Sequence, residues 1–326
     1  MKISVILCTF NRCQSLALTL DSVANSVLPD STEWEVLVVD NRSTDRTRDV
    51  VQDFSVRYPG RFHYLLERAQ GKSYALNAGI QESRGDVVAF LDDDVTVERT
   101  WLHNLTAVLS DESWAGTGGR TLAAGAFTPP RWLSLQEPYN SGAILAALFD
   151  LGDEPLELFR PPYGANMALR RSMFEEYGKF RTDLGPGPDP DVPRPNEDVE
   201  FGRRLIAAGE RLRYEPSAIV YHPILEDRIK KSYFLKWWFD YGRADAREWK
   251  LGPDVCGVPR SYLIILKAGI TQTLPGICQW LFALDPVRRF YCRCQVWKTA
   301  GWIAELYRRA ANPGLRNRAA ARRGSV

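Results

Sequence analysis

The N-terminal third of the chain alternates short, β-rich apolar runs with stretches of helical pattern. The runs comprise residues 3–8, 34–39 and 86–91, with a weaker one at 62–66. Between them, Leu16, Leu20, Val23 and Val27 share one helical face, and residues 44–58 predict a helix with a charged exposed side. This alternation predicts an α/β fold with a mostly parallel sheet flanked by helices on both faces. Ligands bind such sheets at the carboxyl ends of the strands, so the residues that follow each strand are the candidates for function.

The rest of the chain differs in character from this first part. Residues 115–195 are rich in Gly and Pro, and a long irregular stretch of this kind is usually a binding loop or a lid. A helix is predicted over residues 197–208. From Arg228 onward the pattern is helical, aromatic and basic, with 19 Lys and Arg against 6 Asp and Glu. We therefore expect an α/β domain over residues 1–227 and a helical extension over 228–326 with a frayed tail.

Composition excludes several classes of protein. Hydrophobic residues make up 45% and charged residues 25%, as in an ordinary folded domain rather than a disordered or fibrous chain. No run reaches the ~20 apolar residues of a membrane span, and the first apolar stretch is too short for a secretory signal. The six cysteines include no CxxC pair, which argues against a structural zinc site. We expect a cytoplasmic protein, and the basic extension favours a peripheral position on the anionic inner face of the cell membrane.

Three adjacent carboxylates, Asp92, Asp93 and Asp94, directly follow the apolar run that ends at Leu91. Such groups repel one another, so at a strand end they need a counter-ion. Their hard oxygen ligands suit Mg²⁺ or Mn²⁺, which proteins bind together with substrate phosphates. A solvated acidic turn is the alternative, but the position at the carboxyl end of a strand favours the metal.

A second strand also ends in a carboxylate, Asp40, which would open into the same crevice. A buried carboxylate needs hydrogen-bond donors, and a base or ribose could supply them. Thr9 and Asn11 end the first strand and line the same edge. Ser43 and Thr44 come shortly after Asp40, and each is a natural N-cap for the next helix.

Four segments of the chain together resemble family 2 glycosyltransferases of the GT-A fold. In order they read SVILCTFNR, LVVDNRSTD, GKSYALNAGI and GDVVAFLDDD, and the resemblance covers about residues 2–225. It implies a Rossmann-like GT-A domain that binds a nucleotide-sugar donor and carries the DXD motif of this fold. No glycine-rich phosphate loop follows a strand, so a metal ion is expected to hold the phosphates.

The resemblance also implies roles for single residues in a donor site lined by Asn11 and Asp92. Thr9 and Asp40 would contact the nucleotide base, with Lys72 near it, and Asp93 would contact the ribose. Asp94 would coordinate the divalent cation that bridges the diphosphate.

Asn196-Glu197-Asp198 opens the predicted helix and resembles the Glu-Asp motif of the family, whose Asp is the general base of inverting enzymes. An acceptor hydroxyl must lose its proton as it attacks the anomeric carbon, and a positioned carboxylate contributes ~10²–10⁴-fold to such a step. Asp198 is therefore the expected base, with Glu197 second in order. Capping of the helix N-terminus is the alternative role.

Further positions follow from the same resemblance. Gly164 and Asn166 lie in the segment that this family uses near the sugar and the acceptor. His222 lies where some relatives supply a late metal ligand, although a lone histidine is more often structural. The loop of residues 185–196 is expected to close over the site and exclude water.

These observations predict an inverting, metal-assisted hexosyltransferase. The donor would be a nucleotide-diphosphate sugar, with a UDP-sugar as the first expectation, and the acceptor hydroxyl would belong to a glycan, a lipid-linked sugar or a small molecule. A sugar-1-phosphate nucleotidyltransferase is one alternative, but it would want a Gly-rich basic loop at residues 9–12. A catalytically silent GT-A scaffold protein is the other.

The extension contains an aromatic cluster, residues 233–241, flanked by Lys and Arg. Such a cluster suits an anionic membrane surface. It suits equally well a helical subdomain packed on the catalytic half, where it could form part of the acceptor site. No nucleic-acid partner is expected, because the chain contains no recognisable nucleic-acid-binding module.

Overall fold

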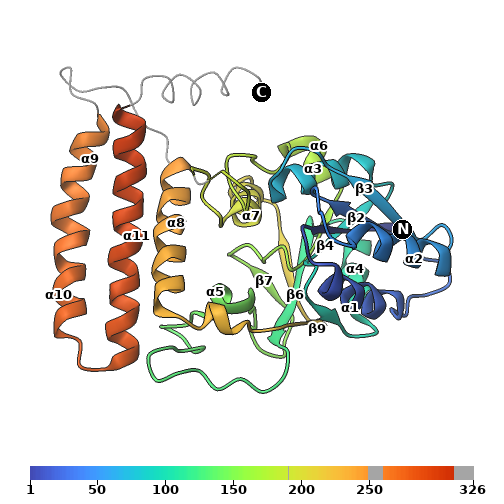
Figure 1. Ribbon diagram of the computed structural model, residues 1–326, viewed down its shortest axis with the longest axis horizontal. Helices are drawn as coiled ribbons and strands as arrows, with labels where there is room; N and C mark the ends of the chain where they lie inside the picture. Colours follow the sequence, from blue (N-terminus) through green and yellow to red (C-terminus); the bar gives the residue numbers. More distant parts are fainter. Residues whose placement is uncertain (190, 249–259, 312–326) are drawn as a thin grey trace. The chain divides into compact units, whose positions relative to one another are not determined.

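Figure 1 shows the computed structural model, which describes residues 1–189, 191–248 and 260–311. The chain divides into two compact units. Unit 1 comprises Met1–Phe127, Gly142–Val192 and Asn196–Leu225, and unit 2 comprises Thr128–Ser141, Pro193–Pro195 and the chain from Glu226 onward. The alternating strands and helices belong to unit 1, and the long C-terminal helices belong to unit 2.

Unit 1 is built on a sheet whose described strands follow the order β3-β2-β1-β4-β8-β6-β9-β5, with β7 paired to β9. The strands are β1 (Lys2–Thr9), β2 (Glu33–Asp40), β3 (Phe62–Leu66), β4 (Val87–Leu91), β5 (Thr96–Val97), β6 (Gly116–Ala123), β7 (Leu156–Leu158), β8 (Asn166–Arg170) and β9 (Leu212–His222). β1 to β4 run parallel to their neighbours in this series, and β8 joins antiparallel to β4. The predicted α/β fold and its four N-terminal strands are confirmed.

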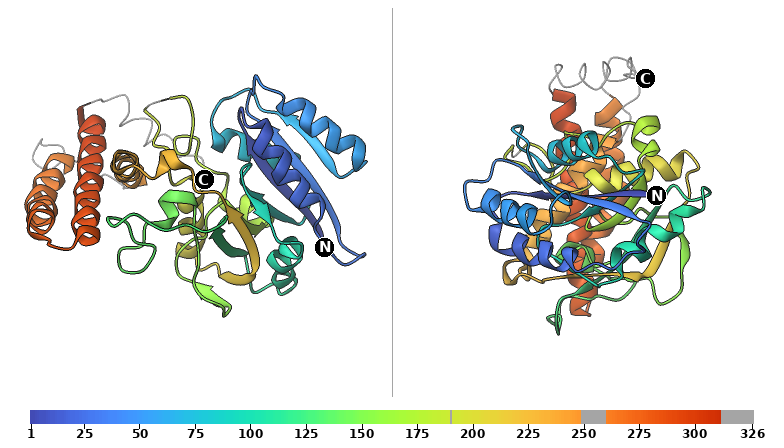
Figure 2. Two further views of the ribbon diagram at one scale, coloured as in Figure 1. Left: turned by 60° about the horizontal axis from the view of Figure 1, so that its bottom comes forward. Right: turned by 90° about the vertical axis from the view of Figure 1, so that its right-hand side faces the viewer.

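The side chains of the central strands alternate between two apolar cores. Ile3, Val5 and Leu7 of β1 face one core, and Ile6 faces the other. Helices cover both faces of the sheet (Figure 2): α1 (Cys13–Ala24), α2 (Thr47–Arg57) and α4 (Trp101–Ala107) on the first, α3 (Lys72–Glu82), α6 (Ser172–Tyr177) and α7 (Glu197–Ala207) on the second. Because strands that are buried on both faces are held in register, their carboxyl ends form a fixed edge.

Two predictions about helix ends are wrong. Val27 lies beyond the end of α1 and is 51% exposed, so it does not share the buried face. α2 begins only at Thr47, and neither Ser43 nor Thr44 caps it. Instead the Asp45 carboxylate accepts hydrogen bonds from the backbone N–H and the hydroxyl of Thr47. The turn before α2 is longer than the pattern indicated, which leaves Ser43 and Thr44 for other contacts.

The Gly- and Pro-rich middle of the chain contains more regular structure than expected. β6, β7 and β8 all lie within residues 115–195. β6 escapes detection because three of its eight residues are glycine, which is unfavourable in strands. Close packing requires these glycines, since a Cβ atom at Gly116 would overlap the side chain of Leu169 on β8.

Unit 2 consists mainly of α8 (Lys231–Glu248), α9 (Arg260–Ala268), the π-helical segment η3 (Gly269–Thr273), α10 (Leu274–Phe282) and α11 (Pro286–Ala311). The aromatic cluster of the extension lies on α8 and packs inside this unit. Phe234 is fully buried between Trp132 and Phe290, and Trp237 stacks on Tyr241. Among the described helices, none combines the length and the apolar character needed to cross a bilayer.

Candidate active site

The carboxyl ends of β1, β2 and β4 meet at one edge of unit 1. In the register of the sheet Thr9 pairs with Asp40, and Leu7 pairs with Leu91, which precedes the acidic triplet. Residues far apart in the chain are therefore brought together, as the parallel arrangement predicts.

Asp40 is buried, and its two oxygens each accept one hydrogen bond. Oδ1 accepts from the backbone N–H of Ser43 at 2.7 Å, and Oδ2 accepts from the hydroxyl of Tyr64 at 2.7 Å. Burial, followed by the bond to Asp40, raises the pKa of Tyr64 to about 12, so its hydroxyl stays protonated and remains a donor. Tyr64 was not predicted, because its role depends on the register of β3 beside β2.

Asn11 links two of the turns at this edge. It adopts a left-handed backbone conformation with φ of 53°, which Asn tolerates better than most residues. Its N–H donates to Ser43 Oγ at 2.9 Å, and its Oδ1 accepts from the backbone N–H of Thr44 at 2.7 Å. Asn11 therefore holds the turn after β1 against the turn after β2.

Arg12 neutralises part of the acidic triplet. Its guanidinium donates to Asp93 Oδ1 at 2.9 Å and to Asp94 Oδ2 at 2.7 Å. Burial raises the pKa of Asp93, and the Arg12 charge opposes that rise. Arg12 was not predicted as a site residue, although its position next to Asn11 at the end of β1 indicates that it lies at this edge.

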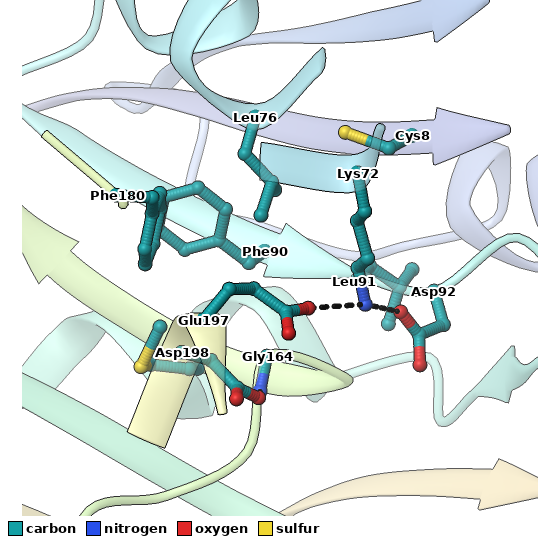
Figure 3. A pocket seen from close by; sticks show the side chains of 11 residues that line it. Cys8, Lys72, Leu76, Phe90, Leu91, Asp92, Gly164, Phe180, Glu197 and Asp198 are labelled. Carbon is teal, nitrogen blue, oxygen red and sulfur yellow. Dashed lines mark hydrogen bonds and ion pairs between the residues drawn. The ribbon is translucent and has the colours of Figure 1, made fainter. Parts of the chain in front are cut away.

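Lys72, the first residue of α3, lies between two carboxylates (Figure 3). Its Nζ is 2.8 Å from Asp92 Oδ1 and 3.5 Å from Glu197 Oε1. Burial acts to lower the pKa of Lys72, but the charges of Asp92 and Glu197 outweigh it and raise the pKa well above the ordinary value. The ammonium group is thus a permanent charge that ties the end of β4 to the start of α7.

The two carboxylates beside Lys72 differ in electrostatic character. For Asp92, burial acts to raise the pKa, but the charges of Lys72 and His222 outweigh it and lower the pKa to about 2. For Glu197, burial and then the neighbouring Asp198 charge raise the pKa to about 7, against the attraction of Lys72. Asp92 is therefore anionic at neutral pH, whereas Glu197 gains and loses its proton close to neutral pH.

Asp198 is held in one orientation by the protein backbone. Its Oδ2 accepts a hydrogen bond of 2.6 Å from the N–H of Gly164, and its Oδ1 accepts from the N–H of Val199 at 2.7 Å. Asp198 and Gly164 also line a pocket in unit 1 (Figure 3). Its other lining residues are Cys8, Lys72, Leu76, Phe90, Leu91, Asp92, Met167, Phe180 and Glu197. Asp198 and Asp92 thus border the same space.

Asp92, Asp94 and His222 could together hold a cation, because their ligand atoms lie within 4.8 Å of one another. His222 is 2% exposed, and its Nε2 lies 3.5 Å from Asp94 Oδ1. Its Nδ1 lies 3.0 Å from the carbonyl oxygen of Pro223, and since a carbonyl can only accept, Nδ1 carries the proton. Nε2 is then the ring nitrogen that faces the carboxylates, and a metal-ligating histidine typically bonds its other ring nitrogen to a carbonyl in this way. Two carboxylates and one imidazole suit Mn²⁺ or Mg²⁺.

The side chain of Asn166 does not reach the pocket. It is 1% exposed, its Oδ1 accepts from Trp101 Nε1 at 2.8 Å, and its Nδ2 donates to the carbonyl oxygens of Arg120 and Ala218. With its amide fully used by the protein, Asn166 is a structural residue in this conformation. The expected contacts of Gly164 and Asn166 with a sugar or an acceptor stay predictions: Gly164 lines the pocket, and the Asn166 side chain is bonded within the protein in this structure.

Part of the loop of residues 185–196 packs against the start of α3. The carbonyl oxygen of Pro186 accepts a hydrogen bond of 2.7 Å from the backbone N–H of Lys72. The carbonyl oxygen of Leu184, just before the loop, accepts from the hydroxyl of Ser73 at 2.7 Å. The loop therefore contacts the element that supplies Lys72 to the pocket. Pro190 lies outside the described residues.

The fold and the acidic edge are typical of one class of protein, an α/β transferase that handles a phosphorylated donor. Residues 4–178 match the family model described as glycosyl transferase family 2. This match spans more than half of the chain, so the chain belongs to glycosyltransferase family 2. It has the GT-A fold, and it is a glycosyltransferase of the nucleotide-sugar-dependent kind.

Individual relatives agree with this assignment. The chain is 28% identical over 282 residues to the succinoglycan biosynthesis protein ExoM of Rhizobium meliloti, with 85% of each chain covered. It is 28% identical over 250 residues to the glucosyl-dolichyl phosphate glucuronosyltransferase of Haloferax volcanii, covering 74% of this chain and 76% of that one. The mannosyltransferase PcManGT from Pyrobaculum calidifontis, solved in complex with GDP-Man and Mn²⁺, superposes with a TM-score of 0.59 at 18% identity, covering 94% and 87% of the two chains. At 18% sequence identity, this structural similarity is evidence for the fold alone.

Proposed function

We propose that the protein transfers a hexose from a nucleotide-diphosphate sugar to an acceptor hydroxyl, with inversion at the anomeric carbon and with a divalent cation. One observation supports this most strongly: Asp198, held by two backbone N–H groups, borders the same pocket as Asp92 at the edge where Asp94 and His222 also lie. A base and a cation-binding group on one cleft are what a single displacement at the anomeric carbon requires.

In this proposal each residue acts through its position. Asp198 accepts the proton of the acceptor hydroxyl, and the Gly164 N–H keeps its carboxylate aimed into the pocket. Lys72 holds Glu197 and Asp92 in place, while Asp40, Thr9 and Asp93 bind the nucleoside. Mg²⁺ or Mn²⁺ held by Asp94 and His222, with Asp92 beside them, would supply Lewis-acid stabilisation of the diphosphate leaving group.

The domain division that we propose follows from these assignments. Residues 1–227 carry the donor site and the catalytic base. Residues 228–326 form a basic extension, helical where it is described, that serves the acceptor or its surroundings; the tail predicted to be frayed, residues 313–326, lies outside the described residues.

The proposed donor is a UDP-sugar, and the proposed acceptor is a lipid-linked glycan. The relative from Haloferax volcanii carries glucosyl-dolichyl phosphate in its name, and ExoM is named for succinoglycan biosynthesis. Both names are compatible with a growing glycan on a carrier. We propose accordingly that the enzyme works in the cytoplasm as a peripheral protein of the inner face of the cell membrane.

A two-stage assay tests the proposed reaction. First, thermal shift with UDP-, GDP- and dTDP-sugars, each with and without Mn²⁺, identifies the donor, because a ligand that binds the folded state raises Tm. Second, the enzyme is incubated with that donor, Mn²⁺ and lipid-linked acceptors, and the nucleotide product and the anomeric configuration of the new bond are determined.

Release of nucleoside diphosphate together with an inverted linkage is the expected result. Formation of nucleoside triphosphate and sugar 1-phosphate from the sugar nucleotide and added pyrophosphate would instead identify a nucleotidyltransferase. Binding of nucleotide sugars without hydrolysis or transfer to any acceptor would favour a silent GT-A protein, and a retained anomeric configuration would contradict the role of Asp198.

A further inference from the structure

The outer side of the α9–α10 helix pair in unit 2 is apolar and exposed. α9, η3 and α10 follow one another as a single helical rod beside α11 (Figure 1). The side of the rod toward α11 packs through ring contacts, Tyr262 with Tyr307 and Trp280 with Trp297. The other side exposes large apolar residues, which we call the apolar face: Leu263, Leu266, Ile270, Leu274, Leu281, Phe282 and Leu284.

The exposure of the apolar face is high and continuous. Leu266, Ile270 and Leu274 are 63%, 59% and 58% exposed. Their spacing of four residues places them one above another on the helix. At the end of the rod, Phe282 is 80% exposed and Leu284 is 98% exposed. Single exposed apolar residues are common on soluble proteins, but a row of them over several helical turns marks a surface that binds something.

Charge indicates what the apolar face binds. The sequence contains no Asp or Glu from Arg260 to Leu284. Lys267 is exposed on α9, and Arg288 and Arg289 are exposed just after the end of the rod, with Asp285 as the one acid of this turn. An apolar stripe with cations beside it and hardly any acid fits a surface that presents both hydrocarbon and anionic groups.

This charge pattern disfavours a second copy of the chain as the occupant. If two apolar faces met around a twofold axis, Lys267, Arg288 and Arg289 of both copies would gather at one interface with few acids to pair with them. The aromatic cluster on α8 is less accessible than the apolar face, because Phe234 is fully buried and Trp238 contacts Tyr291 of α11.

We propose that the apolar face is a membrane-docking surface, and that the α9–α10 rod lies in the plane of an anionic bilayer. The apolar face enters the boundary between headgroups and acyl chains, and Lys267, Arg288 and Arg289 bind lipid phosphates. The rod lies on the bilayer and does not cross it. This inference deepens the peripheral location in the proposed function and rests on that part of it alone, not on the transfer chemistry.

Vesicle flotation of the full chain tests the proposal. Wild type is mixed with vesicles of phosphatidylcholine alone or with 30 mol% phosphatidylglycerol, and the bound fraction is measured at low and high salt. We expect binding to the anionic vesicles that weakens as salt increases. The variant Leu266→Gln/Ile270→Gln/Phe282→Ser/Leu284→Ser should lower the partition coefficient at least tenfold, and Lys267→Glu/Arg288→Glu/Arg289→Glu should abolish the preference for anionic lipid.

Two further measurements keep the result specific. The matched control Leu18→Gln/Val56→Gln changes apolar residues of unit 1 that are 67% and 74% exposed, and it should float like wild type. Donor hydrolysis without lipid should be the same in all these proteins, which shows that they are folded. If wild type itself does not hydrolyse the donor, the proposed reaction is contradicted. The flotation result then still decides the membrane proposal, because it does not depend on the reaction.

Cys278 offers a direct reporter, because it lies exposed on α10 near Leu274 and Leu281. A polarity-sensitive fluorophore is attached to it in a protein that also carries Cys13→Ser and Cys256→Ser. Its emission should shift to the blue only with anionic vesicles. Unchanged emission together with no flotation would overturn the proposal. A dimer in solution that the Leu266→Gln/Ile270→Gln variant converts to a monomer would assign the apolar face to a second copy of the chain.

Discussion

The backbone N–H of Gly164 donates a 2.6 Å hydrogen bond to Oδ2 of Asp198. A Cβ atom at position 164 would come within 3.2 Å of the same oxygen, so a side chain there would crowd the carboxylate. Gly164 therefore serves both as a donor and as a residue small enough to let the carboxylate approach. The proposed base is oriented by the segment that precedes β8 and not by its own helix alone.

The first prediction concerns Asp198→Asn. We expect the rate of glycosyl transfer to fall by ~10²–10⁴-fold, because an amide cannot accept the proton of the acceptor. The NH₂ group of the new Asn side chain would face one of the two backbone N–H groups, and two donors cannot form a hydrogen bond. The free energy of unfolding should therefore fall by about 1 kcal/mol. Steady-state transfer rates, donor affinity by calorimetry and Tm check these effects. Asp153→Asn, at a carboxylate whose side chain is 88% exposed, is the control that should keep full activity. Transfer at the wild-type rate in Asp198→Asn would remove this residue from the role of base.

The second prediction concerns Lys72, whose ammonium group lies between the carboxylates of Asp92 and Glu197. Lys72→Met should destabilise unit 1 by about 3 kcal/mol, because it leaves two buried carboxylates without their partner. Adding Glu197→Gln should recover part of this loss, since one of the stranded charges is then removed. Urea unfolding of the two single variants and the double variant gives the coupling free energy. Additive effects would show that Lys72 and Glu197 do not interact.

Much of this site could be predicted because parallel strands bring their carboxyl ends to one edge. Asp40 and the triplet of Asp92 to Asp94 each follow an apolar run, and the structure places both at that edge. Arg12 and Tyr64 could not be predicted in the same way. Their contacts depend on side-chain rotamers and on which strands are neighbours, and neither is visible in a local pattern.

Asn166 shows the limit of a motif match. The match points to a segment beside the pocket, and Gly164 lines that pocket. It did not give the direction of the side chain at position 166, which turns into the sheet toward Trp101. β6 was missed for a related reason, because its glycines serve close packing against β8 and lower the local strand signal.

The third prediction concerns metal binding. Asp94→Asn and His222→Ala should each weaken Mn²⁺ binding to the protein at least tenfold, because each removes one of three clustered ligands. Electron paramagnetic resonance of free Mn²⁺ measures this without any substrate. His103→Ala changes an exposed histidine on α4 and is the matched control. Equal Mn²⁺ affinity in wild type and His222→Ala would leave His222 with a structural role.

The fourth prediction concerns pH. Burial raises the pKa of Glu197 to about 7, above its value in the unfolded chain, so the folded state binds this proton more tightly. The stability that this proton contributes is therefore complete below pH ~4.5 and is lost as pH rises through about 7. Between pH 5 and 8 wild type should lose about 2 kcal/mol relative to Glu197→Gln, measured by urea unfolding at both values. Glu175→Gln, at a mostly exposed position on α6, should follow wild type. If the difference in unfolding free energy between wild type and Glu197→Gln is the same at pH 5 and pH 8, the pKa of Glu197 is not raised.

The fifth prediction concerns the helix crossing inside unit 2. A Cβ atom at Gly242 of α8 would overlap the carbonyl oxygen of Lys298 on α11, and one at Gly301 of α11 would overlap the carbonyl oxygen of Phe239 on α8. The two helices therefore approach each other closely through reciprocal glycines. Gly242→Ala or Gly301→Ala should destabilise unit 2 by about 1–3 kcal/mol, because the extra methyl forces the helices apart.

Gly269→Ala is the matched control for this crossing. It adds the same methyl group in η3, where nothing lies within 4 Å of the new atom. Since Ala is favoured over Gly within helices by up to ~1 kcal/mol, this variant should be as stable as wild type or more stable. Urea unfolding followed by tryptophan fluorescence compares the three variants, because Trp237, Trp238 and Trp297 all lie in unit 2. If Gly242→Ala proves as stable as Gly269→Ala, the close approach of α8 and α11 is not what holds this unit together.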